Sequence, residues 1–396
     1  MASHAYEASA VPARRPDVWL VGGEDIRLRL PFIDELSRRG FDVSVVGSEP
    51  PDPFVRHGIP YHRYSLSRSV DPLGDRRSLG QLRRIFVDHR PSVVHAFDTK
   101  PAMLASFAAS RAGVPVRVRT LTGMGAVFSS VSPRSLLLRP VYHRMQAAAS
   151  RAVSLTVFQN HDDESYFLRH GMATERGSGF VPGSGIDVDG LRSGRPSPVA
   201  LSALRDELGV GTQPVVTMVS RLVRHKGVRE FCLAARMVRR ERPDCTFLLV
   251  GPLGSEGRQA VRRSEVEQNE DVRWLGPRAD VPALLAASDV FALPSYYREG
   301  IPRALLEAGA MGLPLISTDM PGCREVVRDG WNGLLVPPRD ARALAEAVCA
   351  LLDLGADGRA EMGERARRHV EEQFTLDAVA DAYAEIYRRL LDATAL

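Results

Sequence analysis

The sequence has no apolar run near the roughly 20 residues that a helix needs to cross a bilayer, so no transmembrane span is predicted. Its four cysteines show no Cys-x-x-Cys spacing, which favours buried reduced thiols over a disulfide framework. No dense basic tract is present, and the net charge of +4 does not indicate a nucleic-acid partner. Residues 1–16 lack the apolar core of a signal peptide and are predicted to form a short disordered tail. We therefore expect a cytoplasmic protein, and peripheral contact with the inner face of the membrane stays open.

Lysine is nearly absent, because only Lys100 and Lys226 are lysines among 52 basic residues. The bias towards arginine is typical of a GC-rich genome, so a lysine that persists indicates a position where arginine does not serve. Lys226 is therefore a candidate functional residue. Lys100, which follows an expected strand end, could reach an anionic acceptor or a phosphate, and a surface lysine is the alternative.

The 396 residues favour two domains, and 44% hydrophobic with 25% charged residues is typical of a globular protein. Short apolar runs alternate with helical patterns, which predicts an α/β fold with parallel sheets covered on both faces. Glycine, proline and serine are dense in residues 177–185 and 193–198, which indicates an interdomain hinge. We predict two facing, Rossmann-like, doubly wound domains. The expected strands are 18–21, 41–46, 93–97, 116–120 and 155–158, then 215–219, 246–250, 272–275, 290–293, 315–317 and 334–336.

Two carboxylates stand eight residues apart in the segment from Ser295 to Glu307. Pro302 suits the first position of a helix, so Glu299 is expected in a loop and Glu307 within the helix. A helix N-terminus beside a strand end can bind an anion, and a carboxylate further along can accept hydrogen bonds from sugar hydroxyls. The retaining carboxyl pair of a glycosidase stands roughly 5–5.5 Å apart, whereas Glu307 lies about 7.5 Å past Pro302 along the axis. Separate roles on a phosphate-and-sugar ligand therefore fit better than such a pair.

Arg221 and Lys226 follow the apolar strand expected at 215–219. Ligands of open α/β sheets bind outside the carboxyl ends of strands, so both cations are placed to stabilise a departing diphosphate. A solvated basic loop is the alternative. Gly22 and Gly23 follow the first strand and would let the backbone approach a phosphate, although a plain turn is equally compatible. Residues 22–30, which include Arg27 and Arg29, are expected to form a long loop at the rim of the crevice.

Two other patterns are weaker indications of a functional site. Asp187-Val-Asp189 resembles a metal-binding pair but follows a glycine-rich segment, which favours a loop turn, and no His/Cys cluster has zinc spacing. No metal site or cofactor is predicted. Residues 132–145 combine Arg134, Arg139 and Arg144 with leucines, which could lie on an anionic membrane surface. An ordinary half-buried helix is the alternative.

Together these motifs resemble the retaining GT-B glycosyltransferases of family 4, over nearly all of residues 17–390. The motifs that carry the resemblance are Pro182-Gly-Ser-Gly-Ile-Asp187, Arg221-x4-Lys226-Gly227, Glu299-x7-Glu307, Pro321-Gly-Cys-Arg-Glu325 and Gly330-x-Asn-Gly-Leu-Leu-Val-Pro337. The resemblance implies a GT-B fold with domains at 17–190 and 191–375 and a helix at 376–396 that returns to the first domain. It also implies a nucleotide-sugar donor, retention of the anomeric configuration and no metal requirement.

The resemblance assigns roles residue by residue. Arg221 and Lys226 would hold the diphosphate, Glu299 would face the donor sugar, and Glu307 would bind the ribose hydroxyls. Amides from Gly300 to Ala304 would contact the diphosphate or the sugar, so Gly300, Ile301, Pro302 and Arg303 are assigned to the donor side. The loop at Gly22 and Gly23 would close over the phosphates. The acceptor-side candidates are Lys100, Thr122, Met124, Arg27 and Arg29.

Two further motifs, Thr120-Leu-Thr-Gly-Met-Gly125-x-x-Phe128 and Arg298-Glu-Gly-Ile-Pro-Arg303, resemble a subgroup that uses UDP-linked N-acetylated sugars. That subgroup acts on polyprenyl-diphosphate glycans or other polysaccharide precursors. Met124 stands where many relatives of the family place a histidine. We therefore expect a UDP-sugar donor and a glycan or polyprenyl-diphosphate-linked acceptor. The alternatives are a small-molecule acceptor, a non-hydrolysing nucleotide-sugar epimerase and a non-catalytic nucleotide-sugar-binding protein.

Overall fold

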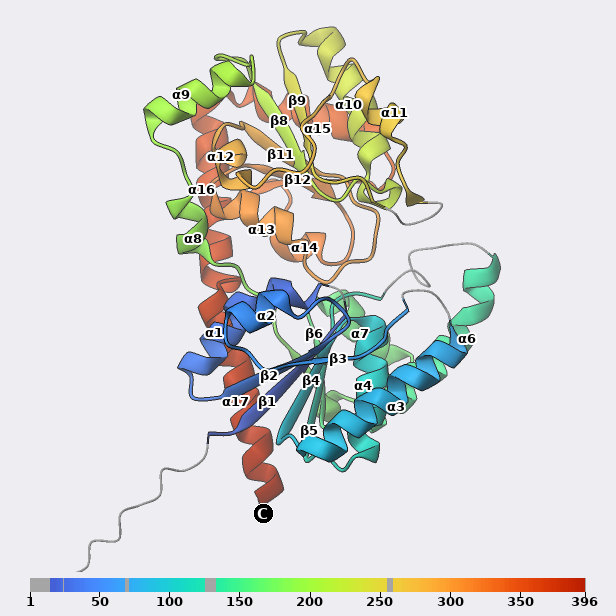
Figure 1. The fold of residues 1–396 in the computed structure, drawn as a ribbon. Helices are drawn as coiled ribbons and strands as arrows, with labels where there is room; N and C mark the ends of the chain where they lie inside the picture. Colours follow the sequence, from blue (N-terminus) through green and yellow to red (C-terminus); the bar gives the residue numbers. More distant parts are fainter. Residues whose placement is uncertain (1–14, 24, 68–70, 125–132, 255–258, 396) are drawn as a thin grey trace, which may run out of the picture.

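The structure is a computed structural model that describes residues 15–23, 25–67, 71–124, 133–254 and 259–395. Most of the predicted tail, residues 1–14, lies outside the described residues, as do Gly125, Phe128 and Ser132 of the motifs above. The described chain forms two lobes that face one another, each built on a parallel sheet with helices on both faces (Figure 1). The predicted α/β architecture with two Rossmann-like sheets is therefore confirmed.

The first lobe contains seven parallel strands within the described residues, in the order β3-β2-β1-β4-β5-β6-β7. In an open sheet of this order, the crevice for a ligand lies where the strand order reverses, between β1 and β4. The strands are β1 (Asp17–Val21), β2 (Asp42–Gly47), β3 (Tyr61–Arg63), β4 (Val93–Phe97), β5 (Val116–Leu121), β6 (Leu155–Phe158) and β7 (Ser178–Phe180). The helices are η1 (Ile26–Arg29), α1 (Leu30–Arg38), α2 (Asp52–Arg56), α3 (Pro72–His89), α4 (Thr99–Arg111), α6 (Pro133–Arg151), α7 (His161–Arg169) and η2 (Glu175–Gly177).

The second lobe repeats this topology in the order β10-β9-β8-β11-β12-β13. Its order reverses between β8 and β11, so the loops after these two strands open on the second crevice. The strands are β8 (Val215–Val219), β9 (Thr246–Val250), β10 (Arg273–Trp274), β11 (Val290–Leu293), β12 (Leu315–Thr318) and β13 (Gly333–Val336). The helices are α8 (Val188–Ser193), α9 (Pro198–Glu207), η3 (Arg224–Lys226), α10 (Val228–Glu241), α11 (Arg263–Glu267), α12 (Val281–Ala286), α13 (Arg303–Ala310), α14 (Cys323–Val326), α15 (Ala341–Asp353) and α16 (Gly355–Gln373).

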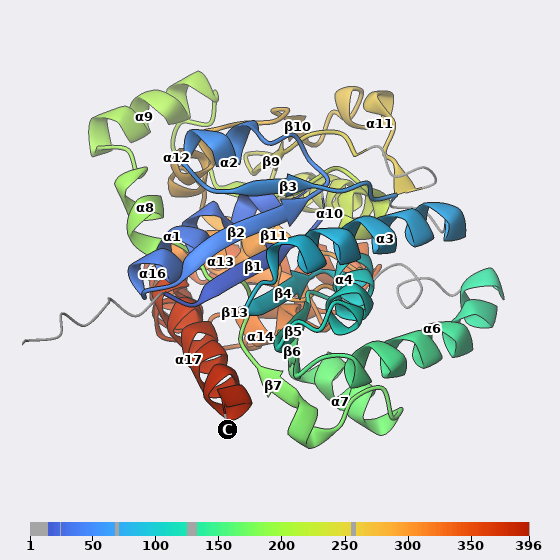
Figure 2. The same cartoon turned by 60° about the horizontal axis from the view of Figure 1, so that its bottom comes forward.

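Strand β1 shows why the first sheet is covered on both faces. Its side chains alternate, so Val18 and Leu20 enter the core shared with α1, while Trp19 and Val21 enter the core shared with α3 and α4. All four are apolar and buried. A strand with four successive apolar residues is stable only between two layers of helices, as Figure 2 shows for this sheet.

The last helix, α17 (Leu376–Ala395), runs back from the second lobe onto the first (Figure 1). The two segments that cross between the lobes are hydrogen-bonded to each other. The Ile186 amide donates to the Phe374 carbonyl (2.9 Å), and the Leu376 amide donates to the Ile186 carbonyl (2.9 Å). A Cβ on Gly185, whose φ is +74°, would stand 2.6 Å from the Cα of Leu376, so this approach requires glycine.

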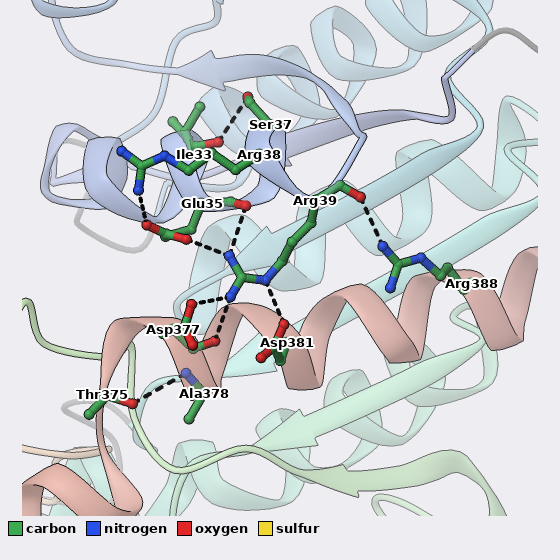
Figure 3. Close-up of polar contacts among 10 residues, drawn as sticks. All are labelled: Ile33, Glu35, Ser37, Arg38, Arg39, Thr375, Asp377, Ala378, Asp381 and Arg388. Atoms are coloured by element: carbon green, nitrogen blue, oxygen red, sulfur yellow. Dashed lines mark hydrogen bonds and ion pairs between the residues drawn. The ribbon is translucent and has the colours of Figure 1, made fainter. Parts of the chain in front are cut away.

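Polar contacts fix α17 on the first lobe. The guanidinium of Arg39 meets Asp377 and Asp381 on α17 and Glu35 on α1, and the Asp381 contact measures 2.7 Å (Figure 3). These three carboxylates raise the pKa of Arg39 against the effect of its burial. The return of the C-terminal helix to the first lobe is confirmed.

A buried polar cluster joins α17 to the sheet beneath it. His95 of β4 contacts the hydroxyl of Tyr387 through Nδ1 (2.5 Å) and that of Thr120 through Nε2 (2.7 Å). The Tyr383 hydroxyl lies 2.9 Å from the same Thr120 oxygen. Burial holds the pKa of His95 well below 6.5, so this histidine is neutral and can act as donor at one nitrogen and acceptor at the other.

Several local predictions need correction. Residues 177–185 were expected to form a hinge, but Ser178–Phe180 is strand β7 and pairs with β6. The loop expected over residues 22–30 contains η1, and α1 already begins at Leu30. Pro302 is the residue before α13 and not its first member. The domain boundaries at 190 and 375 stay predictions; residue 190 lies within α8 and residue 375 between α16 and α17.

Candidate functional site

An ion pair between Lys226 and Glu299 lies at the crevice edge of the second sheet. Lys226 ends η3, which follows β8, whereas Glu299 stands in the loop after β11, so two strands next to the topological switch supply the pair. Lys226 Nζ lies 2.6 Å from Glu299 Oε2, and the two side chains are only 15% and 14% exposed. At this depth the charges are poorly screened, so the ammonium and the carboxylate attract each other strongly.

The other carboxylate oxygen of Glu299 is also held. Ser295 donates its hydroxyl to Glu299 Oε1 (2.8 Å), which leaves the carboxylate fixed from two sides. Cys323 is fully buried nearby, and its burial, with the charge of Glu299, raises the pKa of its thiol to about 11. Cys323 is therefore a neutral packing residue under the site.

Glu307 lies one turn into α13, where its carboxylate accepts from Arg303 Nε at 2.8 Å. Arg303 begins the helix after Pro302, so the amides of this first turn point out of the helix end. The structure thus keeps Glu299 in the loop and Glu307 in the helix. Arg221 is exposed on the loop after β8, five residues before Lys226.

A cavity of about 240 Å³ lies between the lobes and includes Glu299 in its wall. Its lining from the first lobe and the linker is Asp25, Leu28, Arg29, Asp98, Thr122, Gln159, Ser184 and Gly185, and the second lobe adds Tyr297, Glu299, Gly300, Ile301, Arg303 and Leu306. Larger hollows of about 660 Å³ and 740 Å³ occur elsewhere, but neither contains a candidate residue of the site. The smaller cavity is lined by predicted site residues of both lobes.

Two of the acceptor-side candidates line this cavity. Arg29 lies with its guanidinium carbon 3.5 Å from the centre of the Phe97 ring and donates to the Ser184 hydroxyl (3.2 Å). Burial lowers the pKa of Arg29, and Asp98 opposes that shift. Thr122 donates its hydroxyl to Asp98 Oδ1 (2.9 Å).

The remaining first-lobe candidates lie outside the cavity lining. Lys100 pairs with Asp75 at 2.5 Å, and Arg27 pairs with Glu49 at 2.9 Å. Met124 is buried in a small apolar cluster, which explains how a methionine fits there. Gly22 and Gly23 are buried after β1 beside η1.

Asp98 was not among the predicted site residues, yet it lines the cavity and has φ +69° and ψ 177°. A non-glycine residue in this region costs of order 1–3 kcal/mol, and such residues cluster at functional sites. The residue type and its place directly after β4 were visible in the sequence, but the backbone angles were not. Gln159, also in the lining, belongs to no motif, and Ser184 lies within the motif Pro182–Asp187 but was given no role there.

Two negative findings concern the described residues alone. They contain no group of three or more His, Cys, Asp or Glu side chains that could hold a metal ion. Among the described helices, none is both long and apolar enough to span a bilayer.

Comparison with known families gives a match in each lobe. Residues 30–177 match the family model described as a glycosyl transferase 4-like domain, and residues 213–354 match the model described as glycosyl transferases group 1. The first match covers most of the first sheet, and the second covers the loops that carry Lys226 and Glu299.

Individual proteins are similar over nearly the whole chain. The N,N′-diacetylbacillosaminyl-diphospho-undecaprenol α-1,3-N-acetylgalactosaminyltransferase of Campylobacter jejuni is 25% identical and covers 93% of this chain and 97% of its own. The UDP-Gal:α-D-GlcNAc-diphosphoundecaprenol α-1,3-galactosyltransferase of Escherichia coli is 27% identical and covers 83% of this chain and 84% of its own. Among solved structures, Anabaena HepE in complex with UDP and glucose has a TM-score of 0.77 at 23% identity, covering 94% of this chain and 100% of its own.

Proposed function

Because this chain belongs to the family 4 glycosyltransferases with the GT-B fold, we propose that it transfers an N-acetylated hexose from UDP to an acceptor hydroxyl, with retention of configuration. The observation that carries the proposal is the Lys226–Glu299 pair in the wall of the crevice, next to the interlobe cavity. It places a cation for the diphosphate beside a carboxylate for the sugar.

The reaction proposed is a front-face displacement. The acceptor oxygen forms a bond to the anomeric carbon, the bond from that carbon to the diphosphate breaks, and the acceptor proton passes to a donor phosphate oxygen. UDP leaves with the bonding electrons, so negative charge grows on the phosphate while the bond breaks. Lys226 and Arg221 would stabilise that charge, which is the largest catalytic contribution available here. Since these cations supply the positive charge, the proposal invokes no metal.

The acceptor would enter from the first lobe. Asp98 and Thr122 form a hydrogen-bonded pair in the cavity wall opposite the Glu299 loop, and Arg29 lies beside them. We assign Asp98 the role of accepting a hydrogen bond from the attacking hydroxyl and so orienting it. Facing lobes also exclude water, which limits hydrolysis of the donor.

A polyprenyl-diphosphate-linked acceptor is the partner we propose. The Campylobacter jejuni and Escherichia coli relatives are both named for undecaprenyl-diphosphate-linked substrates, and the second is named for a UDP-sugar. An acceptor of this kind is anchored in a bilayer, so the enzyme would work at the cytoplasmic membrane face.

Helix α6 supplies a surface for that contact. Leu136, Leu137, Val141 and Met145 are exposed on it, and Leu137 is 79% exposed. The helix carries four arginines and no acidic residue between Pro133 and Arg151, and it extends away from the first sheet in both views (Figures 1 and 2). Apolar side chains flanked by arginine fit an anionic lipid surface.

The test is transfer with a donor panel. UDP-GlcNAc, UDP-GalNAc, UDP-galactose and GDP-mannose are each supplied with a short polyprenyl-diphosphate-linked N-acetylated sugar, and UDP or GDP release and product anomer are measured. We expect an α-linked product from a UDP-N-acetylhexosamine. A β-linked product would refute retention, and turnover with GDP-mannose alone would refute the proposed donor.

Two substitutions in the short helix η3 test the site itself. Lys226→Ala should lower kcat by roughly 100-fold, because a donor to developing charge is lost. Arg224→Ala is the matched control, since this residue belongs to the same short η3 helix but is exposed and pairs with Glu265. Equal activity of both variants would contradict the role given to Lys226.

A further inference from the structure

The loop that carries Glu299 is held by the opposite lobe. The Gly300 amide donates to the Thr122 carbonyl (2.7 Å), and Asn160 Nδ2 donates to the Glu299 carbonyl (3.2 Å). Thus the side chain of Glu299 pairs within the second lobe, while the peptide group between Glu299 and Gly300 is bonded to the first lobe through both its carbonyl and its amide. The position of this carboxylate depends on both lobes.

The approach is close enough to require glycine. A Cβ on Gly300 would stand 2.3 Å from Gln159 Oε1 and 2.8 Å from the Thr122 carbonyl oxygen. Such distances are far below van der Waals contact, so any larger residue would push the loop off the first lobe. The loop and the end of β5 therefore fit as two halves of one contact.

An ion pair secures this contact beside Glu299. Arg298 Nε lies 2.6 Å from Asp163 Oδ1, and Asp163 is 1% exposed. The other Asp163 oxygen accepts from Asn160 Nδ2 (3.1 Å), the same group that holds the Glu299 carbonyl. The pair thus fixes both the side chain before Glu299 and the amide that bonds to it.

We propose that Arg298 and Asp163 are positioning residues that place Glu299 against Lys226 only when the two lobes are together. The first lobe then completes the donor site in the second, and separated lobes hold a donor without the geometry to cleave it. The structural half of this inference stands on the contacts alone, and its catalytic half rests on the proposed function.

The chain contains a matched control. Asp162 precedes Asp163 at the start of α7 and also crosses between the lobes, with Arg324 Nη1 2.8 Å from its Oδ2. Arg324 belongs to α14 and not to the Glu299 loop, and both of its partners are well exposed. Asp162→Asn therefore removes an interlobe ion pair but keeps the main-chain carbonyl of Asp162, which accepts from Arg298 Nη2 (3.4 Å).

Hydrogen–deuterium exchange of the full chain without ligand tests the structural half. Asp163→Asn should speed exchange in the peptide containing Gly300 by roughly tenfold, because its amide opens with the loop. Asp162→Asn should leave that rate within about twofold. Equal rates in both variants would overturn the proposal. Should Asp163→Asn fail to fold, Arg298→Gln breaks the same pair from the second lobe.

Donor turnover tests the catalytic half. With UDP-GalNAc as the probe, Asp163→Asn should lower turnover by roughly tenfold or more, because small displacements of a reacting geometry are costly. The Kd for UDP, which lacks the sugar, should stay unchanged. A weaker UDP affinity with normal turnover would overturn this half. If the wild type consumes none of the UDP-sugars, the proposed function fails, whereas the exchange result still decides the contact.

Discussion

Asp98 holds a backbone conformation that side chains rarely adopt, at a position where it lines the interlobe cavity. Its carboxylate accepts from Thr122, whose carbonyl in turn accepts from Gly300 of the other lobe. The strain at Asp98 is thus kept next to the contact between the lobes. Strain of this kind persists only where the surroundings enforce it, which is typical of a functional residue.

Two substitutions at position 98 separate the effect of backbone strain from the effect of losing the carboxylate. Asp98→Gly and Asp98→Ala both remove the carboxylate, but only glycine relaxes at φ +69°. We expect the glycine variant to be more stable than the alanine variant by about 1 kcal/mol, although alanine is favoured over glycine in most helical contexts. Urea denaturation measures the difference.

Activity of the same variants provides the second readout. Both should raise the KM for the acceptor and leave the Kd for UDP unchanged, because Asp98 belongs to the first lobe. Equal stability of the two variants would contradict backbone strain at Asp98, and an altered affinity for UDP would contradict the acceptor-side role of Asp98.

Prediction from sequence worked at residues whose chemistry shows in a pattern. Lys226 stood out because lysine is so scarce, and Glu299 because it stands just before a proline and an expected helix. Their roles stay proposals, but the structure does bring them together. The partner Asp163 could not be foreseen, since its contact with Arg298 spans 135 residues and depends on how two sheets are placed.

At the scale of elements, the central strands and the edge strands of the second sheet were predicted, whereas the two edge strands of the first sheet were not. Strand β4 is apolar except at His95 and is buried on both faces, so its apolar run identifies it in the sequence. Strands β3 and β7 have three residues each, only partly buried, at the two edges of the first sheet. Their pairing is decided by the neighbouring strand, and their own residues give no alternating pattern.

Helix α6 permits a direct test of membrane contact. Leu137→Glu should lower the fraction that sediments with vesicles containing anionic lipid, because it places a carboxylate on the apolar, arginine-flanked face. Leu73→Glu is the control, since Leu73 is 82% exposed on α3 and lies outside that face. Sedimentation of the wild type should also fall with salt. Failure of the wild type to sediment with anionic vesicles would refute membrane binding through this surface of α6.

At the scale of the whole molecule, the first lobe is made from both ends of the described chain. Val379, Tyr383 and Tyr387 of α17 are buried in the same core as the strands β1 and β4. The amphipathic pattern of this helix was visible in the sequence, but periodicity does not identify the surface that a helix covers. Only the resemblance to a family supplied that part of the prediction.

Removal of residues 376–396 should therefore unfold the first lobe and spare the second. Each large apolar side chain that loses its partners costs about 1.5–3 kcal/mol, so several together approach the total stability of a domain. Limited proteolysis should cleave the first lobe, and UDP binding should persist. Removal of residues 392–396 is the control, because residues 392–394 are exposed. Protection of the first lobe in the longer truncation would contradict this view.

The return of α17 also sets an order of events during synthesis. The ribosome makes the first sheet early, yet the helix that covers one of its faces emerges only after the whole second lobe. Until then the nascent first lobe exposes an apolar groove, while the second lobe can already fold as a unit. The lobe that is translated first thus matures after the second lobe, and a chaperone that shields this groove would act before α17 emerges.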